Sequence, residues 1–367
     1  MKPLIVILVV TFTYGLQHNS SLKLVHVFFR HGSRVPDGYE LYRSHERYEY
    51  YKQIGFGSLT NAGKLTSYQL GNVLRKRYND FLGEDFESDA VFIKSTDFER
   101  TKMTSLLVLA GVFPPSEKDK WNDKLNWIPI PFTYDKQGTD YDMTKAYVFC
   151  PVYQRELQRV FETDEVKAVI KGYNKTFELA IKKTGKMYTT LGDVFLLHQL
   201  IHIEQTMNVT LPSWAVEAFP DLRRITLTQF YYENANTLMK RLNGGRMLAK
   251  TVENMKHTIQ GTIQQKKKIF LYSGHDFTII NMLYSLNLNK FHFPNFNAAI
   301  CIELHQELTT GMHFVKILYI KDVFDEPELL VIPGCGDMCE FNKFVETITQ
   351  HLPVNYTEEC ESTIPLD

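Results

Sequence analysis

Residues 23–36 read KLVHVFFRHGSRVP, an apolar run that passes directly into a cluster of charged side chains. Valine and phenylalanine dominate residues 23–29, which predicts a β-strand. Ligands of α/β proteins bind at the carboxyl ends of strands, so Arg30, His31 and Arg34 lie where a functional site is expected. This stretch therefore predicts both a strand of the core and a polar site at its end.

Strands and helices alternate on either side of a less regular middle, which is typical of an α/β layer with a parallel sheet. Asp97 is a plausible N-cap for the second helix. We expect strands over residues 91–96, 268–273, 298–305 and 313–319, and helices over residues 60–82, 97–110, 234–264 and 277–286.

The alternation is lost in residues 115–230. Loops rich in tryptophan and proline lead into helical stretches at 156–180 and 192–204, and no clear apolar strand occurs there. We therefore expect a single α/β core formed by residues 16–114 and 231–367, with residues 115–230 inserted as a mostly helical cap.

The composition is that of an ordinary globular protein. The chain has 367 residues, 44% of them hydrophobic and 23% charged, which excludes disorder, collagen and coiled coil. Its 41 Lys+Arg balance 42 Asp+Glu to a net charge of -1, which argues against nucleic acid as the main partner. A small, focused basic pocket remains compatible with this balance.

The N-terminus indicates the secretory route. A basic start, an apolar run over residues 4–10 and small residues near Gly15 predict a signal peptide over residues 1–15. The run is too short for a membrane span, which needs ~20 residues, and no later segment is apolar enough. We expect a secreted glycoprotein, with the lysosomal lumen as the alternative location. Four N-glycosylation sequons fit this route: Asn19, Asn174, Asn208 and Asn355.

Two further predicted strands also end in residues that suit a phosphate ester. Guanidinium groups match phosphate oxygens and stay charged, a histidine can act as nucleophile, and a carboxyl group can protonate a leaving oxygen. If the three strand exits share one edge of the sheet, they gather six side chains: Arg30, His31, Arg34, Arg100, His275 and Asp276.

These residues carry a resemblance to a known family. Residues 30–36 match the RHGxRxP signature of the histidine acid phosphatases, a branch of the phosphoglycerate mutase-like superfamily, and His275 with Asp276 matches its distal His-Asp pair. The sequence is most similar to prostatic, lysosomal and arthropod venom acid phosphatases. The resemblance implies a three-layer α/β/α domain with a helical cap, acting on phosphomonoesters; it leaves a homodimer open. The likeness also includes residues 55–60, 95–101, 211–215 and 333–339.

The resemblance further implies a two-step mechanism with no metal and no cofactor. His31 would attack phosphorus and form a phosphohistidine, and Asp276 would donate a proton to the leaving alcohol. We expect an acidic pH optimum, because Asp276 must be protonated to act as an acid and His275 binds phosphate best as a cation. The phosphoryl oxygens would be held by Arg30, Arg34, Arg100 and His275.

The five cysteines should pair in an oxidising compartment. The short spacing and flanking glycines favour a local Cys335–Cys339 disulfide over a redox or zinc site. The resemblance adds a long-range Cys150–Cys360 pair that ties the cap to the C-terminal tail. It also implies that Cys301 lacks its partner, because the family's second cysteine is absent just upstream of Asn208. We expect Cys301 to be an unpaired thiol buried in its strand.

Two alternative functions remain open, and one histidine pair needs a separate interpretation. One alternative is a phytase-like enzyme for highly phosphorylated inositol, which would need a more basic pocket. The other is a non-catalytic secreted protein that binds small molecules on the same scaffold. His198 and His202 have the i, i+4 spacing of a zinc-protease helix, but Gln199 replaces the required glutamate. We interpret both histidines as packing residues of the cap. Substrate specificity is expected to depend on residues 115–230.

Overall fold

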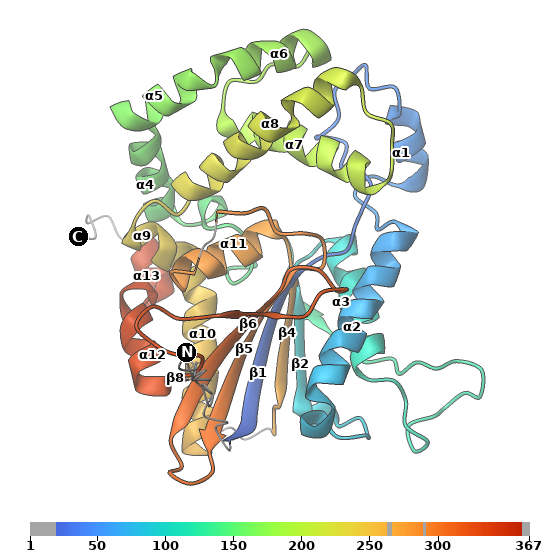
Figure 1. Ribbon diagram of the computed structural model, residues 1–367, viewed down its shortest axis with the longest axis vertical. Coiled ribbons are helices and arrows are strands. Elements are labelled where there is room, and N and C mark those ends of the chain that lie inside the picture. Colours follow the sequence, from blue (N-terminus) through green and yellow to red (C-terminus); the bar gives the residue numbers. More distant parts are fainter. Residues whose placement is uncertain (1–19, 263–265, 289–290, 362–367) are drawn as a thin grey trace, which may run out of the picture.

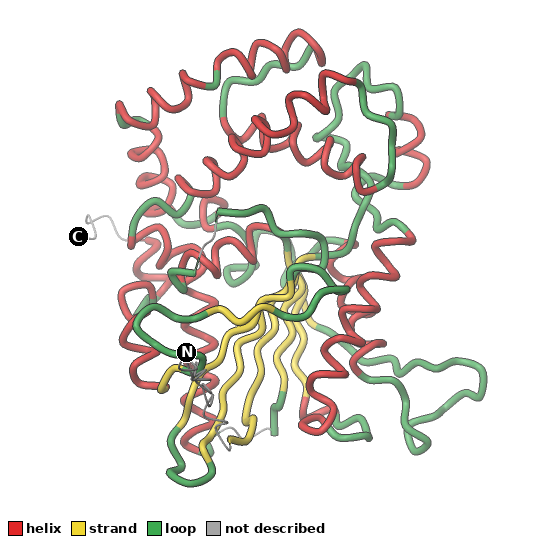
Figure 2. Tube along the Cα trace, in the orientation of Figure 1, coloured by secondary structure: helices red, strands yellow, loops and turns green. Residues whose placement is uncertain are grey.

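The computed structural model describes residues 20–262, 266–288 and 291–361. The predicted signal peptide over residues 1–15 and the sequon at Asn19 lie outside these residues. The described part has two halves, a sheet flanked by helices and a group of helices above it (Figure 1). Figure 2 shows that the strands end beneath this upper group of helices.

One mixed sheet forms the centre of the core. The strand order is β3-β2-β4-β1-β5-β6-β7, and β8 pairs with β6. The first four strands in this order are parallel, and the remaining pairs are antiparallel. The strands are β1 (Ser20–Arg30), β2 (Val91–Ser95), β3 (Thr133–Tyr134), β4 (Ile269–Gly274), β5 (Ala299–Glu307), β6 (His313–Ile320), β7 (Glu328–Leu330) and β8 (Cys339–Glu340).

The alternation of side chains along β1 explains why the sheet is covered on both faces. Val25 and Val27 pack into a cluster with α2 (Asn61–Leu82) and α3 (Glu99–Val112), whereas Phe28 packs into the opposite cluster. The opposite cluster draws on α10 (Arg246–Gln260), α11 (Asp276–Ser285) and α12 (Phe341–Ile348). The predicted three-layer α/β/α fold is confirmed, with a sheet that is mixed rather than wholly parallel.

A separate hydrophobic cluster holds the upper helices together. It includes Tyr51 of α1 (Tyr48–Ile54), so a segment before α2 also packs on the cap side. The division into a core of residues 16–114 and 231–367 and a cap of 115–230 stays a prediction. The cap-side helices are α4 (Pro151–Phe161), α5 (Asp164–Gly172), α6 (Asn174–Thr184), α7 (Leu191–Thr206) and α8 (Ser213–Tyr232); the short α9 (Thr237–Lys240) leads back to α10.

Several local predictions differ from the structure. The expected helix over 156–180 is three helices, because Thr163 caps a new helix by accepting a hydrogen bond from the Val166 backbone N–H. Asp97 is not an N-cap; Phe98 holds that position, and the Asp97 carboxylate instead contacts Lys102. Strand β3, inside the region expected to lack strands, has two exposed residues and therefore no apolar pattern.

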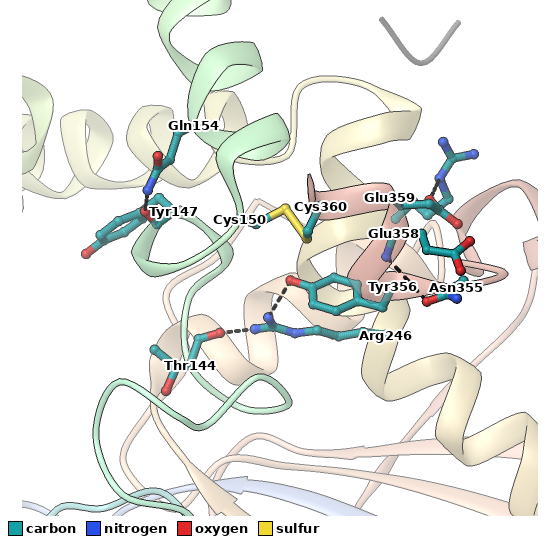
Figure 3. The surroundings of a disulfide bond; sticks show 11 residues. Thr144, Tyr147, Cys150, Gln154, Arg246, Asn355, Tyr356, Glu358, Glu359 and Cys360 are labelled. Carbon is teal, nitrogen blue, oxygen red and sulfur yellow. Dashed lines mark hydrogen bonds and ion pairs between the residues drawn. A yellow bond between two sulfur atoms is a disulfide. The ribbon is translucent and has the colours of Figure 1, made fainter. Parts of the chain in front are cut away.

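Two disulfides join the predicted pairs. Cys150–Cys360 connects the start of α4 to α13 (Tyr356–Glu361; Figure 3). Cys335–Cys339 closes a local loop. Cys301 is unpaired and fully buried in β5, as expected. Beside the long-range bridge, Arg246 donates hydrogen bonds to the Tyr356 hydroxyl and to the backbone carbonyl of Thr144 (Figure 3).

Candidate active site

The strand exits predicted from the sequence converge on one pocket of about 340 Å³. Arg30 ends β1, Gly274 ends β4 beside it, and the parallel pairing aligns these two residues directly. Arg100 comes from the first turn of α3, which follows β2. Five of the six predicted residues line the pocket: His31, Arg34, Arg100, His275 and Asp276.

Arg30 lies beneath the pocket rather than in its wall. Its guanidinium is completely buried, donates to the Pro294 carbonyl at 2.7 Å and stacks over the Phe296 ring at 4.0 Å. The same group lies 3.3 Å from the Asp276 carboxylate and 3.4 Å from the side-chain oxygen of Gln199. In this ligand-free structure Arg30 therefore contacts Asp276 directly and supplies positive charge from below.

The protonation of His31 is defined by one hydrogen bond. Nδ1 lies 2.9 Å from the Gly32 carbonyl, which can only accept, so Nδ1 carries the proton and Nε2 keeps its lone pair. Gly32 is needed here, because a Cβ would approach the Gly63 carbonyl to 2.4 Å. Burial, followed by the charges of Arg100 and neighbouring cations, lowers the pKa of His31 well below its usual value. The lowered pKa favours the neutral imidazole that a nucleophile requires.

Two carboxylates hold the arginines of the pocket in place. Glu40 accepts two hydrogen bonds from the Arg34 guanidinium, at 2.8 and 2.6 Å, and is itself buried. Asp37 lies 3.5 Å from Arg34 and 3.4 Å from Arg100. Such bidentate pairing fixes the plane of a guanidinium group, which prepares its remaining N–H groups for a phosphate.

Asp276 lies between two positive charges. Burial acts to raise its pKa, but the charges of Arg30 and Lys145 chiefly outweigh burial, and the pKa is lowered. Gln199 donates a 2.5 Å hydrogen bond to the carboxylate, which also favours the charged form. In the ligand-free pocket Asp276 is therefore a carboxylate.

His275 is held by a hydroxyl chain at the end of β2. Its Nε2 lies 2.9 Å from the Thr96 hydroxyl, which donates in turn to Thr101 at 2.9 Å. Burial, followed by the charge of Arg100, lowers the pKa of His275 well below its usual value. Burial beside arginines favours the neutral imidazole, and the expectation that His275 holds a bound phosphate as a cation stays a prediction.

The rest of the wall is apolar and aromatic. Lys145 is the exception: burial acts to lower its pKa, but Glu233, Tyr147 and Asp276 outweigh burial and raise it, so its ammonium stays charged. Its Nζ lies 3.4 Å from Glu233 and 5.3 Å from the centre of the Phe277 ring. The apolar lining residues are Phe98, Tyr147, Val148, Phe195, Leu196 and Phe277.

The two cap histidines on α7 pack as expected. His198 and His202 stack on the Phe219 ring at 5.2 and 6.4 Å, and burial chiefly lowers the pKa of both. No group of side chains in the described part of the chain could hold a metal ion. Gln199, between these histidines in the sequence, is the residue that reaches the site.

Sequence reasoning missed five residues of the site. Four of them lie in loops or in the cap, where no strand end or family signature marked them; the fifth, Thr96, lies within residues 95–101 of the family likeness, but no role was assigned to it. For Lys145 the signal was weak, since a lysine among aromatic residues is ordinary in a surface loop. The missed residues are Asp37, Glu40, Thr96, Lys145 and Gln199.

A family model and two curated relatives relate this chain to the histidine acid phosphatases. Residues 21–320 match the model of the histidine phosphatase superfamily (branch 2). The chain is 35% identical to venom acid phosphatase Acph-1 of Apis mellifera over 360 residues, covering 97% of this chain and 91% of that protein. It is 30% identical to prostatic acid phosphatase of Homo sapiens over 347 residues, covering 93% and 88%.

Solved structures share the fold at lower identity. The apo form of Hafnia alvei phytase aligns with a TM-score of 0.66 at 16% identity, covering 93% of this chain and 98% of that one.

In the part of the chain that the structure describes, none of the helices has the length and hydropathy that crossing a bilayer requires.

Proposed function

This chain belongs to the histidine phosphatase superfamily (branch 2), and on that premise we propose that it hydrolyses phosphomonoesters at the pocket around His31. It is an acid phosphatase that works through a phosphohistidine intermediate, as its family does. The observation that carries the assignment of His31 is its hydrogen bond to the Gly32 carbonyl, which leaves Nε2 unprotonated. Nε2 is then the atom that attacks phosphorus.

In the first step the Nε2 lone pair forms a bond to phosphorus as the bond to the leaving oxygen breaks. Asp276 gives its proton to that oxygen, which departs as an alcohol. In the second step water attacks the phosphohistidine, Asp276 takes a proton from it, and inorganic phosphate leaves. Arg34, Arg100 and His275 line the same pocket and would hold the phosphoryl oxygens, with Arg30 adding charge from below.

The charges of the pocket support an acidic optimum. The ligand-free enzyme keeps Asp276 ionised, but a bound phosphate group brings negative charge beside it and raises its pKa. The lowered pKa of His31 favours the neutral form in which it can attack phosphorus, while acid supplies the proton that Asp276 must donate. Activity should therefore rise as the pH falls below neutral, until the substrate or His31 itself takes up a proton.

The apolar wall favours substrates with an uncharged, apolar leaving group. Beyond the charges that surround the phosphate, Lys145 is the one additional cation in the lining, and Glu233 already pairs with it. A highly phosphorylated inositol would present several anionic groups to Phe98, Phe195 and Phe277. The wall therefore argues against a phytase-like specificity. Four of its apolar residues come from residues 115–230, where specificity is expected to originate: Tyr147, Val148, Phe195 and Leu196.

The test is phosphate release at mildly acidic pH. Wild-type protein should hydrolyse p-nitrophenyl phosphate, and His31→Ala should lower kcat at least 10³-fold without lowering the melting temperature by more than a few degrees. A wild type that does not turn over would refute the proposal. Selective hydrolysis of inositol hexakisphosphate would instead favour the phytase-like alternative.

We also propose secretion. The sequence of residues 1–15 and the two disulfides support an oxidising compartment. Asn174, Asn208 and Asn355 are all exposed, as glycan attachment requires. Protein exported from insect cells should begin at Leu16 and lose mass on treatment with peptide N-glycosidase; an intact Met1 in the exported protein would contradict the signal peptide.

A further inference from the structure

A second pocket, here called the cap pocket, lies on the cap away from the catalytic residues. It has a volume of about 560 Å³ and is bounded by residues 42–47, by α7 and by residues 210–215 at the start of α8. Figure 1 shows the neighbouring helices, with α1 beside the end of α7. It shares no lining residue with the catalytic pocket, although α7 contributes to both.

A buried carboxylate lies in the wall of the cap pocket. Glu204 is 5% exposed, and its Oε1 accepts a 2.7 Å hydrogen bond from Tyr51 and lies 3.3 Å from His45 Nε2. Among the described residues no donor contacts Oε2. A buried carboxylate is costly unless its acceptor sites are filled, so Oε2 offers a strong position for a donor that enters the pocket.

The remaining lining defines the body of such a ligand. Leu197, Leu200 and Ile201 of α7 face the pocket on one side, and Leu211 and Trp214 line it near α8. The lining is mixed: these apolar side chains face polar and charged ones from residues 42–47, and Glu204 is the buried carboxylate of the pocket. A cavity of this size suits a small molecule, and an ammonium group is attracted both by a carboxylate and by the face of an indole ring, both of which line this pocket.

The rim restricts the charge of the ligand. Arg47, Lys183 and Glu46 contribute to the lining, the Lys183 side chain is exposed, and Glu46 lies 3.5 Å from Arg47. The two cations exceed the single carboxylate of Glu46, so the rim would repel a second positive charge, and a ligand with one ammonium group is favoured over a polyamine. From the carboxylate, the apolar lining and the rim, we propose that the cap pocket binds a small primary amine with an aromatic or aliphatic body, its ammonium group on Glu204.

The experiment is calorimetric titration of the mature, full-length protein with 2-phenylethylamine near pH 7. We expect a Kd on the order of 100 µM, as for a ligand of this size in a well-matched site. 2-Phenylethanol, which keeps the ring but lacks the charge, should bind at least 10-fold more weakly. Glu204→Gln should weaken binding of the amine at least 10-fold, because it keeps Oε1 for Tyr51 and changes only the group at Oε2.

Two controls separate the cap pocket from the catalytic pocket. Saturating inorganic phosphate and Asp276→Asn should leave amine binding unchanged, and Glu204→Gln should leave turnover of p-nitrophenyl phosphate unchanged. Binding should also quench the fluorescence of Trp214, so Trp214→Phe should bind the amine without that signal. If Glu204→Gln lowers the melting temperature, Trp214→Ala serves as the second variant and should weaken binding several-fold.

The opposite results would overturn the assignment. The assignment fails if millimolar 2-phenylethylamine gives no heat of binding. It also fails if 2-phenylethanol binds as tightly as the amine, or if spermidine binds more tightly than the amine. Binding that is unchanged in Glu204→Gln, or lost with phosphate or in Asp276→Asn, would place the amine elsewhere and refute the cap pocket as its site.

Discussion

Replacing Gln199 by methionine should shift the pH profile of the enzyme toward the alkaline side. Gln199 Nε2 donates a 2.5 Å hydrogen bond to Asp276 Oδ2, in a position where both side chains are buried. A hydrogen bond donated to a carboxylate stabilises its charged form and lowers its pKa. Methionine has a similar length but no donor, so the pKa of Asp276 should rise when this bond is removed.

The size of the shift follows from the energy of the lost bond. A hydrogen bond to a charged group contributes about 1.5–3 kcal/mol, and 1.36 kcal/mol corresponds to one pKa unit. The pKa of Asp276 should therefore rise by about 1–2 units. Since Asp276 acts in its protonated form, the alkaline limb of the kcat profile should move upward by the same amount.

The assay is kcat against pH with an alkyl phosphate such as β-glycerophosphate, whose poor leaving group depends on the proton donor. Gln205→Met is the matched control, because Gln205 lies on the same helix but is exposed, and it should leave the profile in place. An alkaline limb that stays put or moves toward acid in Gln199→Met, with a melting temperature equal to that of the control, would refute the assigned roles of Gln199 and Asp276.

Four further predictions concern stability, thiols and metal. Burial lowers the pKa of His26 to about 3. Between pH 6.5 and 3 the unfolded chain therefore binds a proton at His26 that the folded protein does not bind, so the free energy of unfolding decreases as the pH falls through this range. At pH 4.5 this costs on the order of 3 kcal/mol. His26→Phe should reduce the loss of unfolding free energy between pH 7 and 4.5 by about that amount in urea titrations, and an unchanged loss would contradict the prediction. The Cys150–Cys360 bridge closes a loop with a sequence separation of 210, so Cys150→Ser should lower the free energy of unfolding by about 5 kcal/mol; a chemical-denaturation midpoint equal to that of wild type would count against the bridge. Cys301 is buried and burial raises its thiol pKa to about 12, so maleimide should label it only after unfolding, and labelling of native protein would disprove the burial. Dialysis against EDTA should leave kcat unchanged, and recovery of lost activity with a divalent cation would show that the enzyme needs a metal.

The fold could be predicted where the pattern is local. The alternation along β1 placed Val25 and Val27 on one face and Phe28 on the other, because successive side chains of a strand point to opposite faces. The site could be predicted for a related reason: the parallel strands β1 and β4 must end at the same edge of the sheet. The residues directly after them, including His31 and Asp276, had to lie close together.

Local pattern failed where a contact spans a long stretch of chain. Gln199 reaches Asp276 across 77 residues, and nothing in a helical sequence says which face will meet the core. Thr163 divides a region that reads as one helix, since a cap depends on the geometry of a single hydrogen bond.

The sequence by itself determined the chemistry: a strand that ends in Arg30 and His31, a distal Asp276, and cysteines whose pairing the family pattern implied. The tertiary structure alone decided the electrostatics. It buried Arg30 beneath the pocket, paired Glu40 with Arg34, and lowered the pKa of His275 through burial and the charge of Arg100. The reason is physical, since a charge depends on burial and on neighbours distant in the chain, and neither can be read from the order of residues.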